Sequence, residues 1–71
     1  MINIKLFDVL QSRGMTQRDL HEVSSVREGT IGDMCNNESK MLGVKSLDRI
    51  CTVLKCKIED ILEFIPNEED F

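Results

Sequence analysis

The sequence predicts an all-α fold, a compact five-helix domain in which the second and third helices form a helix-turn-helix. Three observations predict it. Residues 16–20, TQRDL, have the pattern of a capped helix start. Val26 and Ile31 follow at the spacing of a tight turn and another short helix, and apolar residues at helical spacing precede and follow this segment. The 71 residues leave room for one domain, which we expect over residues 1–66, with an acidic C-terminal tail at residues 67–71.

The first helix is expected over residues 4–13, and Gly14 ends it because a glycine accepts the positive φ of a helix terminus. Its apolar residues recur near the 3.6-residue period and should face the core: Ile4, Leu6, Phe7, Val9 and Leu10. Thr16 is expected to cap the second helix, which runs to about residue 23. Asp19, three positions later, completes a capping-box pattern.

Residues 24–26 are expected to form the turn, with Val26 pointing inward as its anchor. The third helix spans residues 27–36 and should bury Ile31 and Met34. Gly29 and Gly32 inside it each cost about 1 kcal/mol relative to alanine. Such a helix needs tertiary support, or exists because something must approach its backbone. Residues 36–40 form a polar loop.

The fourth helix is expected over residues 44–55 and the fifth over residues 58–64, before Pro66. Apolar residues of the fourth helix should face the core: Val44, Leu47, Ile50, Cys51 and Leu54. The fifth helix contributes Ile61 and Leu62. An alternative for the chain ends is a short strand at each, because apolar and polar residues alternate at Ile2 and Ile4, and less clearly near Phe64.

The composition argues against several classes of protein. The net charge is −4, but residues 58–71 hold six acids and no base, so the remaining 57 residues hold nine bases against seven acids. A surface for nucleic acid therefore remains possible outside the C-terminal end. Three cysteines without a CxxC pair and a single histidine do not suit a zinc site. We expect no catalytic site, metal or cofactor, no signal peptide or membrane span, and a location in the cytoplasm.

Three parts of the sequence resemble a known family: TQRDL, the anchors Val26 and Ile31, and the ending SLDRICTVLKCKIEDILEFIP. The chain is similar to the lambda-repressor-like helix-turn-helix group, which includes the Cro and phage-repressor transcription factors. The likeness is to its short single-domain members from bacteria and mobile elements, and it covers about residues 3–66. It implies that the third helix lies in the major groove and that the second crosses the phosphate backbone.

The resemblance also implies which residues contact DNA. Gln17 would start the second helix beside a phosphate, and Arg27 and Glu28 would meet guanine and cytosine in the groove. Arg18 and Lys40 would lie near phosphates. The full set of implied contacts is Gln17, Arg18, Arg27, Glu28, Gly29, Thr30, Asp33, Asn36 and Lys40.

Three residues at the turn depart from the family pattern. The family usually has alanine near position 21, an apolar residue near 24 and glycine near 25, where this chain has His21, Ser24 and Ser25. We expect Val23 to take over the apolar role at the turn. Together these departures are expected to change the angle between the two helices.

Two functions follow as hypotheses. The first is a sequence-specific regulator of transcription that binds double-stranded operator DNA as a homodimer, through the fifth helix, Phe64, Ile65 and the N-terminal residues. The alternative is a protein-interaction module that keeps the fold, has lost DNA and modulates another regulator. Glu28, Asp33 and the acidic C-terminal end favour this alternative. A continuous positive strip across Arg13, Arg18, Arg27 and Lys40 would favour DNA.

Overall fold

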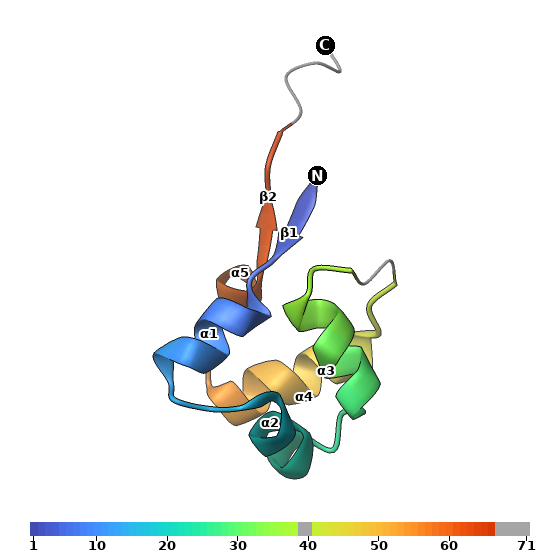
Figure 1. The fold of residues 1–71 in the computed structure, drawn as a ribbon. Helices are drawn as coiled ribbons and strands as arrows, with labels where there is room; N and C mark the ends of the chain where they lie inside the picture. Colours follow the sequence, from blue (N-terminus) through green and yellow to red (C-terminus); the bar gives the residue numbers. More distant parts are fainter. Residues whose placement is uncertain (39–40, 67–71) are drawn as a thin grey trace.

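The computed structural model describes residues 1–38 and 41–66 and contains five helices and two short strands in these ranges. Their order is β1 (Ile2–Ile4), α1 (Leu6–Ser12), α2 (Gln17–Ser24), α3 (Glu28–Cys35), α4 (Val44–Leu54), α5 (Ile58–Ile61) and β2 (Leu62–Phe64). The helices enclose one core, while the two strands pair and project from the helical body as a ribbon (Figure 1). The five predicted helices are confirmed. Lys40 and the acidic tail at residues 67–71 lie outside the described residues.

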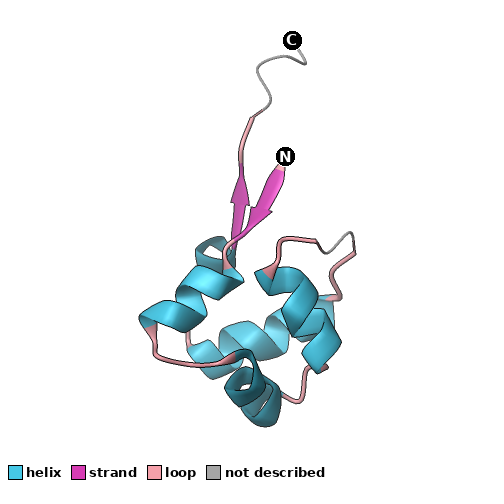
Figure 2. Ribbon diagram, viewed as in Figure 1, coloured by secondary structure: helices cyan, strands magenta, loops and turns pink. Residues whose placement is uncertain are grey.

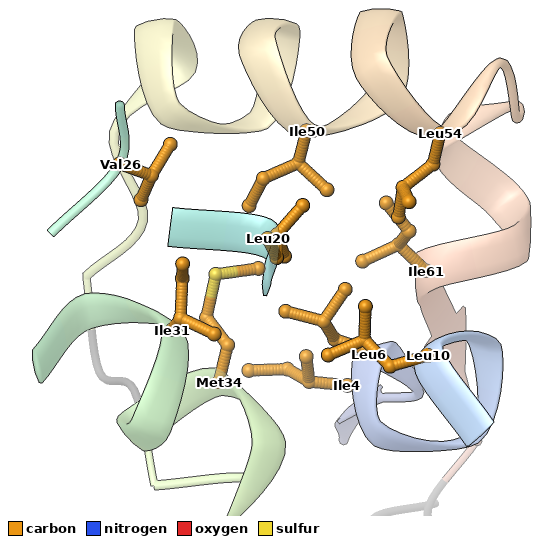
Figure 3. Packing of buried hydrophobic residues seen from close by; sticks show 10 residues of the cluster. All are labelled: Ile4, Leu6, Leu10, Leu20, Val26, Ile31, Met34, Ile50, Leu54 and Ile61. Carbon is orange, nitrogen blue, oxygen red and sulfur yellow. The ribbon is translucent and has the colours of Figure 1, made fainter. Parts of the chain in front are cut away.

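The core is aliphatic, and every helix contributes to it. Ten apolar residues are buried: Ile4, Leu6, Leu10, Leu20, Val26, Ile31, Met34, Ile50, Leu54 and Ile61. Figure 3 shows Leu20 of α2 in the middle of this cluster, between Ile50 of α4 and Met34 of α3. Because α2 and α3 pack on the same cluster, the core fixes one helix of the pair against the other.

The prediction that Phe7 and Val44 belong to the core is wrong. Phe7 is 45% exposed and Val44 is 80% exposed. Phe7 follows the buried Leu6 directly, and a step of one residue turns a side chain by about 100° around a helix. Val44 is the first residue of α4, one turn before the helix reaches the core. Leu47 and Cys51 are half-buried and pack against the core, as do the other two free thiols, Cys35 and Cys56.

The chain ends form a two-stranded antiparallel ribbon, which is the alternative that alternation suggested (Figure 2). Ile2 pairs with Phe64, Asn3 with Glu63 and Ile4 with Leu62. The predicted first helix therefore starts at Leu6 instead of residue 4, and the predicted fifth helix ends at Ile61 instead of residue 64. Residues 62–64 find hydrogen-bond partners for their backbone groups in β1, so they form a strand and do not extend the short α5.

The ribbon has one apolar and one polar face. Side chains alternate along a strand, so the pair Ile2–Phe64 lies on the same face as Ile4–Leu62. The inner pair packs on the core, since Ile4 is only 8% exposed, whereas Ile2 and Phe64 are 56% and 68% exposed. The apolar face therefore runs from the core out along the projecting ribbon.

Candidate nucleic-acid interface

The start of α2 is fixed by reciprocal hydrogen bonds between Thr16 and Asp19. The Asp19 amide donates to the Thr16 hydroxyl, and the Asp19 carboxylate accepts from the Thr16 amide, both at 3.0 Å. Hydrogen bonding of the Asp19 carboxylate to the Thr16 amide, and next to the Thr16 side chain, lowers the pKa of the Asp19 carboxyl. The predicted capping box is confirmed, and it holds the first turn of α2 in place.

A three-residue turn, residues 25–27, joins α2 to α3. Ser25 adopts the left-handed conformation with φ of +62°, where the family pattern has glycine, and its amide donates to the His21 carbonyl at 3.0 Å. Val26 follows and is 3% exposed, so it is the inward anchor that the sequence predicted. Ser25 thus adopts the left-handed backbone conformation that a glycine would adopt at this position of the turn.

Ser24 stands where the family pattern has an apolar residue, and its hydroxyl is fully hydrogen-bonded. Its side chain is buried at 5% exposure, and its hydroxyl donates to the Leu20 carbonyl at 2.6 Å. The same oxygen accepts from the Val26 amide at 3.2 Å. The expectation that Val23 replaces it is wrong, because Val23 is 58% exposed. A serine suits the site since both functions of its hydroxyl are satisfied locally.

His21 links the end of α2 to the start of α3. Its Nδ1 lies 2.7 Å from the Val26 carbonyl oxygen, and because a carbonyl only accepts, Nδ1 carries the hydrogen. Its Nε2 lies 3.9 Å from the Glu28 carboxylate, a contact that becomes an ion pair when the ring is protonated. The side chains of His21 and Ser24 therefore stabilise the turn with hydrogen bonds, while Ser25 makes the backbone hydrogen bond that a glycine would also make. Their effect on the angle between the helices stays a prediction.

The structure brings most of the implied DNA contacts to the outward side of α3. Ile31 and Met34 are fully buried on the inner side. Five residues on the outward side are exposed: Arg27, Glu28, Gly29, Asp33 and Asn36. Thr30, on the same side, is half-buried. Positions 29, 33 and 36 are three and four residues apart, so they follow one face of the helix. We call Arg27, Glu28, Gly29, Thr30, Asp33 and Asn36 the outer face of α3.

The two glycines of α3 differ in what surrounds them. A Cβ at Gly32 would lie 3.6 Å from Gln17 Oε1, so the Gln17 side chain from the start of α2 lies over the middle of α3. A Cβ at Gly29 would meet no other atom within 4 Å. A methyl group at position 32 would therefore touch Gln17 at ordinary van der Waals distance, while a methyl group at position 29 would point into open space. The two glycines in the sequence indicated that something approaches the α3 backbone. The sequence did not indicate that Gln17 lies near Gly32 and that Gly29 has no such neighbour.

Charge on this surface is mixed. Arg18 pairs with Glu22 at 3.5 Å on α2, with both side chains largely exposed, and such an exposed pair contributes about 0.5 kcal/mol. Arg27, the N-cap residue of α3, forms no ion pair with any described residue. Its guanidinium is therefore unpaired among the described residues, at the start of the outer face.

Other kinds of site find less support in the described ranges. No group of three or more histidine, cysteine, aspartate or glutamate side chains is arranged there to hold a metal ion. An open hollow lies between the end of α2 and α4, lined by residues 23–25, 48–49 and 52–53, and no residue of α3 lines it. No helix among residues 1–38 and 41–66 is long and apolar enough to cross a bilayer.

Comparison with known proteins agrees with this geometry. A family model for the Cro/C1-type helix-turn-helix DNA-binding domain matches residues 5–67. Among solved structures, the crystal structure of the transcriptional regulator VanUg is similar, with a TM-score of 0.72 and 29% sequence identity. The match covers 93% of this chain and 89% of that one. A search of curated proteins finds no match.

Proposed function

Since the chain belongs to the Cro/C1-type helix-turn-helix family of DNA-binding domains, we propose that it is a sequence-specific regulator of transcription that inserts α3 into the major groove of an operator, as a homodimer. One observation carries the proposal. Ile31 and Met34 fix α3 from the inside, while its outer face holds exposed polar and charged side chains. A rigid helix that presents such a face is what direct reading of base edges requires.

The contacts divide into positioning and reading groups. Gln17 and Arg18 stand at the start of α2, where backbone amides and side chains meet phosphates in this family of motifs. Arg27 suits a bidentate contact to guanine, and Glu28 suits acceptance from the amino group of cytosine. The remaining contacts are Gly29, Thr30, Asp33, Asn36 and Lys40, the last lying outside the described residues.

Gly29 supports close approach of DNA to α3. An exposed glycine inside a helix costs about 1 kcal/mol relative to alanine. Among residues 1–38 and 41–66 no side chain or neighbouring element fills the space beside it, so packing of the described residues does not explain the glycine. A backbone or base edge of DNA that comes close to the helix at this point does explain it.

The ribbon is the surface that we assign to the homodimer. Its apolar residues are exposed near the projecting end: Met1 at 55%, Ile2 at 56%, Phe64 at 68% and Ile65 at 39%. Ile2 and Phe64 continue the apolar face that Ile4 and Leu62 start at the core. A second copy covers this face by symmetry, and it doubles the short stretch of bases that one α3 reads.

A protein-interaction module remains the second candidate because Glu28 and Asp33 are both exposed on the outer face of α3. Carboxylates there reduce the attraction to phosphates. The two functions differ in salt dependence, because release of counterions from DNA makes affinity fall steeply with salt.

The test measures binding of the protein to DNA fragments from its own locus by fluorescence anisotropy, at several salt concentrations. Arg27→Ala should lower the preference for the best site over scrambled DNA by about 1–3 kcal/mol. Arg49→Ala is the matched control, because Arg49 is an exposed arginine on α4 away from α3, and it should leave that preference unchanged. Failure to bind any fragment at low salt, or equal losses in both variants, would contradict the proposal.

A further inference from the structure

A chain of hydrogen bonds connects the end of α3 to the ribbon, and Asn37 is its first member. Asn37 Oδ1 accepts from the Ile4 amide of β1 at 2.9 Å, and its Nδ2 donates to Asn3 Oδ1 at 3.1 Å. Asn3 Nδ2 in turn donates to the Glu63 carboxylate of β2 at 3.0 Å. One side-chain amide therefore joins the end of α3 to the first strand, and Asn3 extends the connection to the second.

The backbone of Asn37 suits this role. Its φ is +58°, in the left-handed region that asparagine accepts more readily than most residues. Its own amide donates to the Met34 carbonyl at 3.1 Å, which ties the residue to the last turn of α3. The side chain is thereby held in a fixed relation to the buried part of the helix, since Met34 is fully buried.

The Ile4 amide needs a partner from outside the ribbon. Met1 and Ile65 exchange hydrogen bonds across the strands, and the Lys5 amide donates to the Ile61 carbonyl. In an antiparallel pair the residues between such positions direct their amides away from the partner strand. Ile4 is one of them, so Asn37 supplies the acceptor that a third strand would provide. The bond is partly buried, which shields it from competition by water.

We propose that Asn37 is a positioning residue that fixes α3 relative to the ribbon, so that pairing of two ribbons sets the separation of the two reading helices on DNA. The inference rests on the proposed function. If each ribbon is rigidly joined to its α3, the dimer accepts one distance between half-sites and rejects others. Loosening the joint widens the accepted range of spacings without touching a residue of the outer face.

The test compares Asn37→Gly with Lys55→Gly. Glycine also adopts the left-handed backbone at position 37, and the substitution removes the side chain with its two hydrogen bonds. Lys55 has φ of +53° at the end of α4 and no hydrogen bond to the ribbon, so Lys55→Gly controls for the added glycine. The measurement is affinity for operators whose two half-sites are moved apart or together in single base-pair steps, and for one half-site alone.

We expect the wild type and Lys55→Gly to prefer one spacing by tenfold or more. Asn37→Gly should bind the single half-site within about twofold of wild type and lose most of the spacing preference. Retention of the full preference by a folded Asn37→Gly would overturn the proposal. Binding by a single copy, with no spacing preference in the wild type, would also overturn it.

A second readout needs no DNA. The proposal predicts at least tenfold faster hydrogen exchange at the Ile4 amide in Asn37→Gly, and a changed orientation of the ribbon relative to α3 in residual dipolar couplings. Lys55→Gly should change neither. Unchanged exchange and orientation would overturn the joint itself, whereas a wild type with the joint that binds no DNA would overturn only the proposed function.

Discussion

The hydrogen bonds within the helix-turn-helix and those within the ribbon join residues at very different separations along the sequence. In the helix-turn-helix, the hydrogen bonds that shape the cap and turn join residues at most five positions apart, as in Thr16–Asp19 and His21–Val26. In the ribbon, Asn3 bonds to Glu63 and Met1 bonds to Ile65, 60 and 64 positions apart along the chain. The helix-turn-helix, to which we assign DNA reading, is thus specified locally, whereas the ribbon, to which we assign dimerisation, exists only once the chain has folded.

The two regions also differ in how they relate to the core. Leu20, in the helix-turn-helix, is fully buried at the centre of the apolar cluster (Figure 3). Phe64, the largest side chain of the ribbon, is mostly exposed and is the last residue of β2, the strand that projects from the helical body in Figure 1. This difference separates stability from association: one region should govern folding of the single chain and the other should govern pairing of two chains.

The largest predicted effect comes from truncating each region in turn. Leu20→Ala should lower the free energy of unfolding by about 2–5 kcal/mol, because it opens a cavity in the core. Phe64→Ala should change the stability of the monomer by less than about 0.5 kcal/mol, since its side chain is mostly in water, and should lower the dimer fraction. Urea denaturation and sedimentation, both at several protein concentrations, measure the two effects. A loss of monomer stability in Phe64→Ala as large as that in Leu20→Ala would remove the distinction.

A smaller effect sharpens the local character of the helix-turn-helix. The pKa of Asp19 is lowered in the fold by the Thr16 amide and then by its hydroxyl, so the carboxylate stabilises the fold above its unfolded pKa of about 3.9. That contribution is lost as the pH falls through the lowered folded pKa. The stability difference between wild type and Asp19→Asn, followed by urea denaturation from pH 6 to pH 2, should therefore shrink as the pH falls. Thr16→Ser keeps the hydroxyl and should follow the wild type; a difference that stays constant with pH would contradict the account.

The same contrast explains what the sequence could predict. The five helices, the capping box and the anchors Val26 and Ile31 rest on periodicity and on signals within a few residues, and all of them are confirmed. Residues 62–64 continue the apolar spacing of α5, so local pattern favours a helix there. Their strand depends on β1, about 60 residues away. The local alternation of apolar and polar residues suggested a strand at each end, but it did not indicate that the two strands pair.

The sequence does not predict the roles of Ser24 and Asn37. Ser24 is a polar departure from an apolar position of the family pattern, but a serine near a helix end can donate to the carbonyl four residues earlier, and Ser24 does so. The sequence predicts only a polar loop at Asn37, whereas its side-chain partners lie in β1. An asparagine just past a helix C-cap is the signal that points to Asn37, because this residue type often ends helices in the left-handed conformation. The DNA contacts came from the family resemblance, and they stay predictions.

The most direct test of the central claim, that the outer face of α3 reads DNA, is the pair of variants Gly29→Ala and Gly32→Ala. Both should hold or raise the stability of the free protein, by up to about 1 kcal/mol, because alanine favours a helix and neither site is crowded. Affinity for the operator, measured by anisotropy beside the urea midpoint, should then separate the two. We predict that Gly29→Ala binds roughly tenfold more weakly or worse, while Gly32→Ala, whose new methyl lies under Gln17, binds within about threefold of wild type. A Gly29→Ala protein with wild-type affinity for the operator would contradict the account.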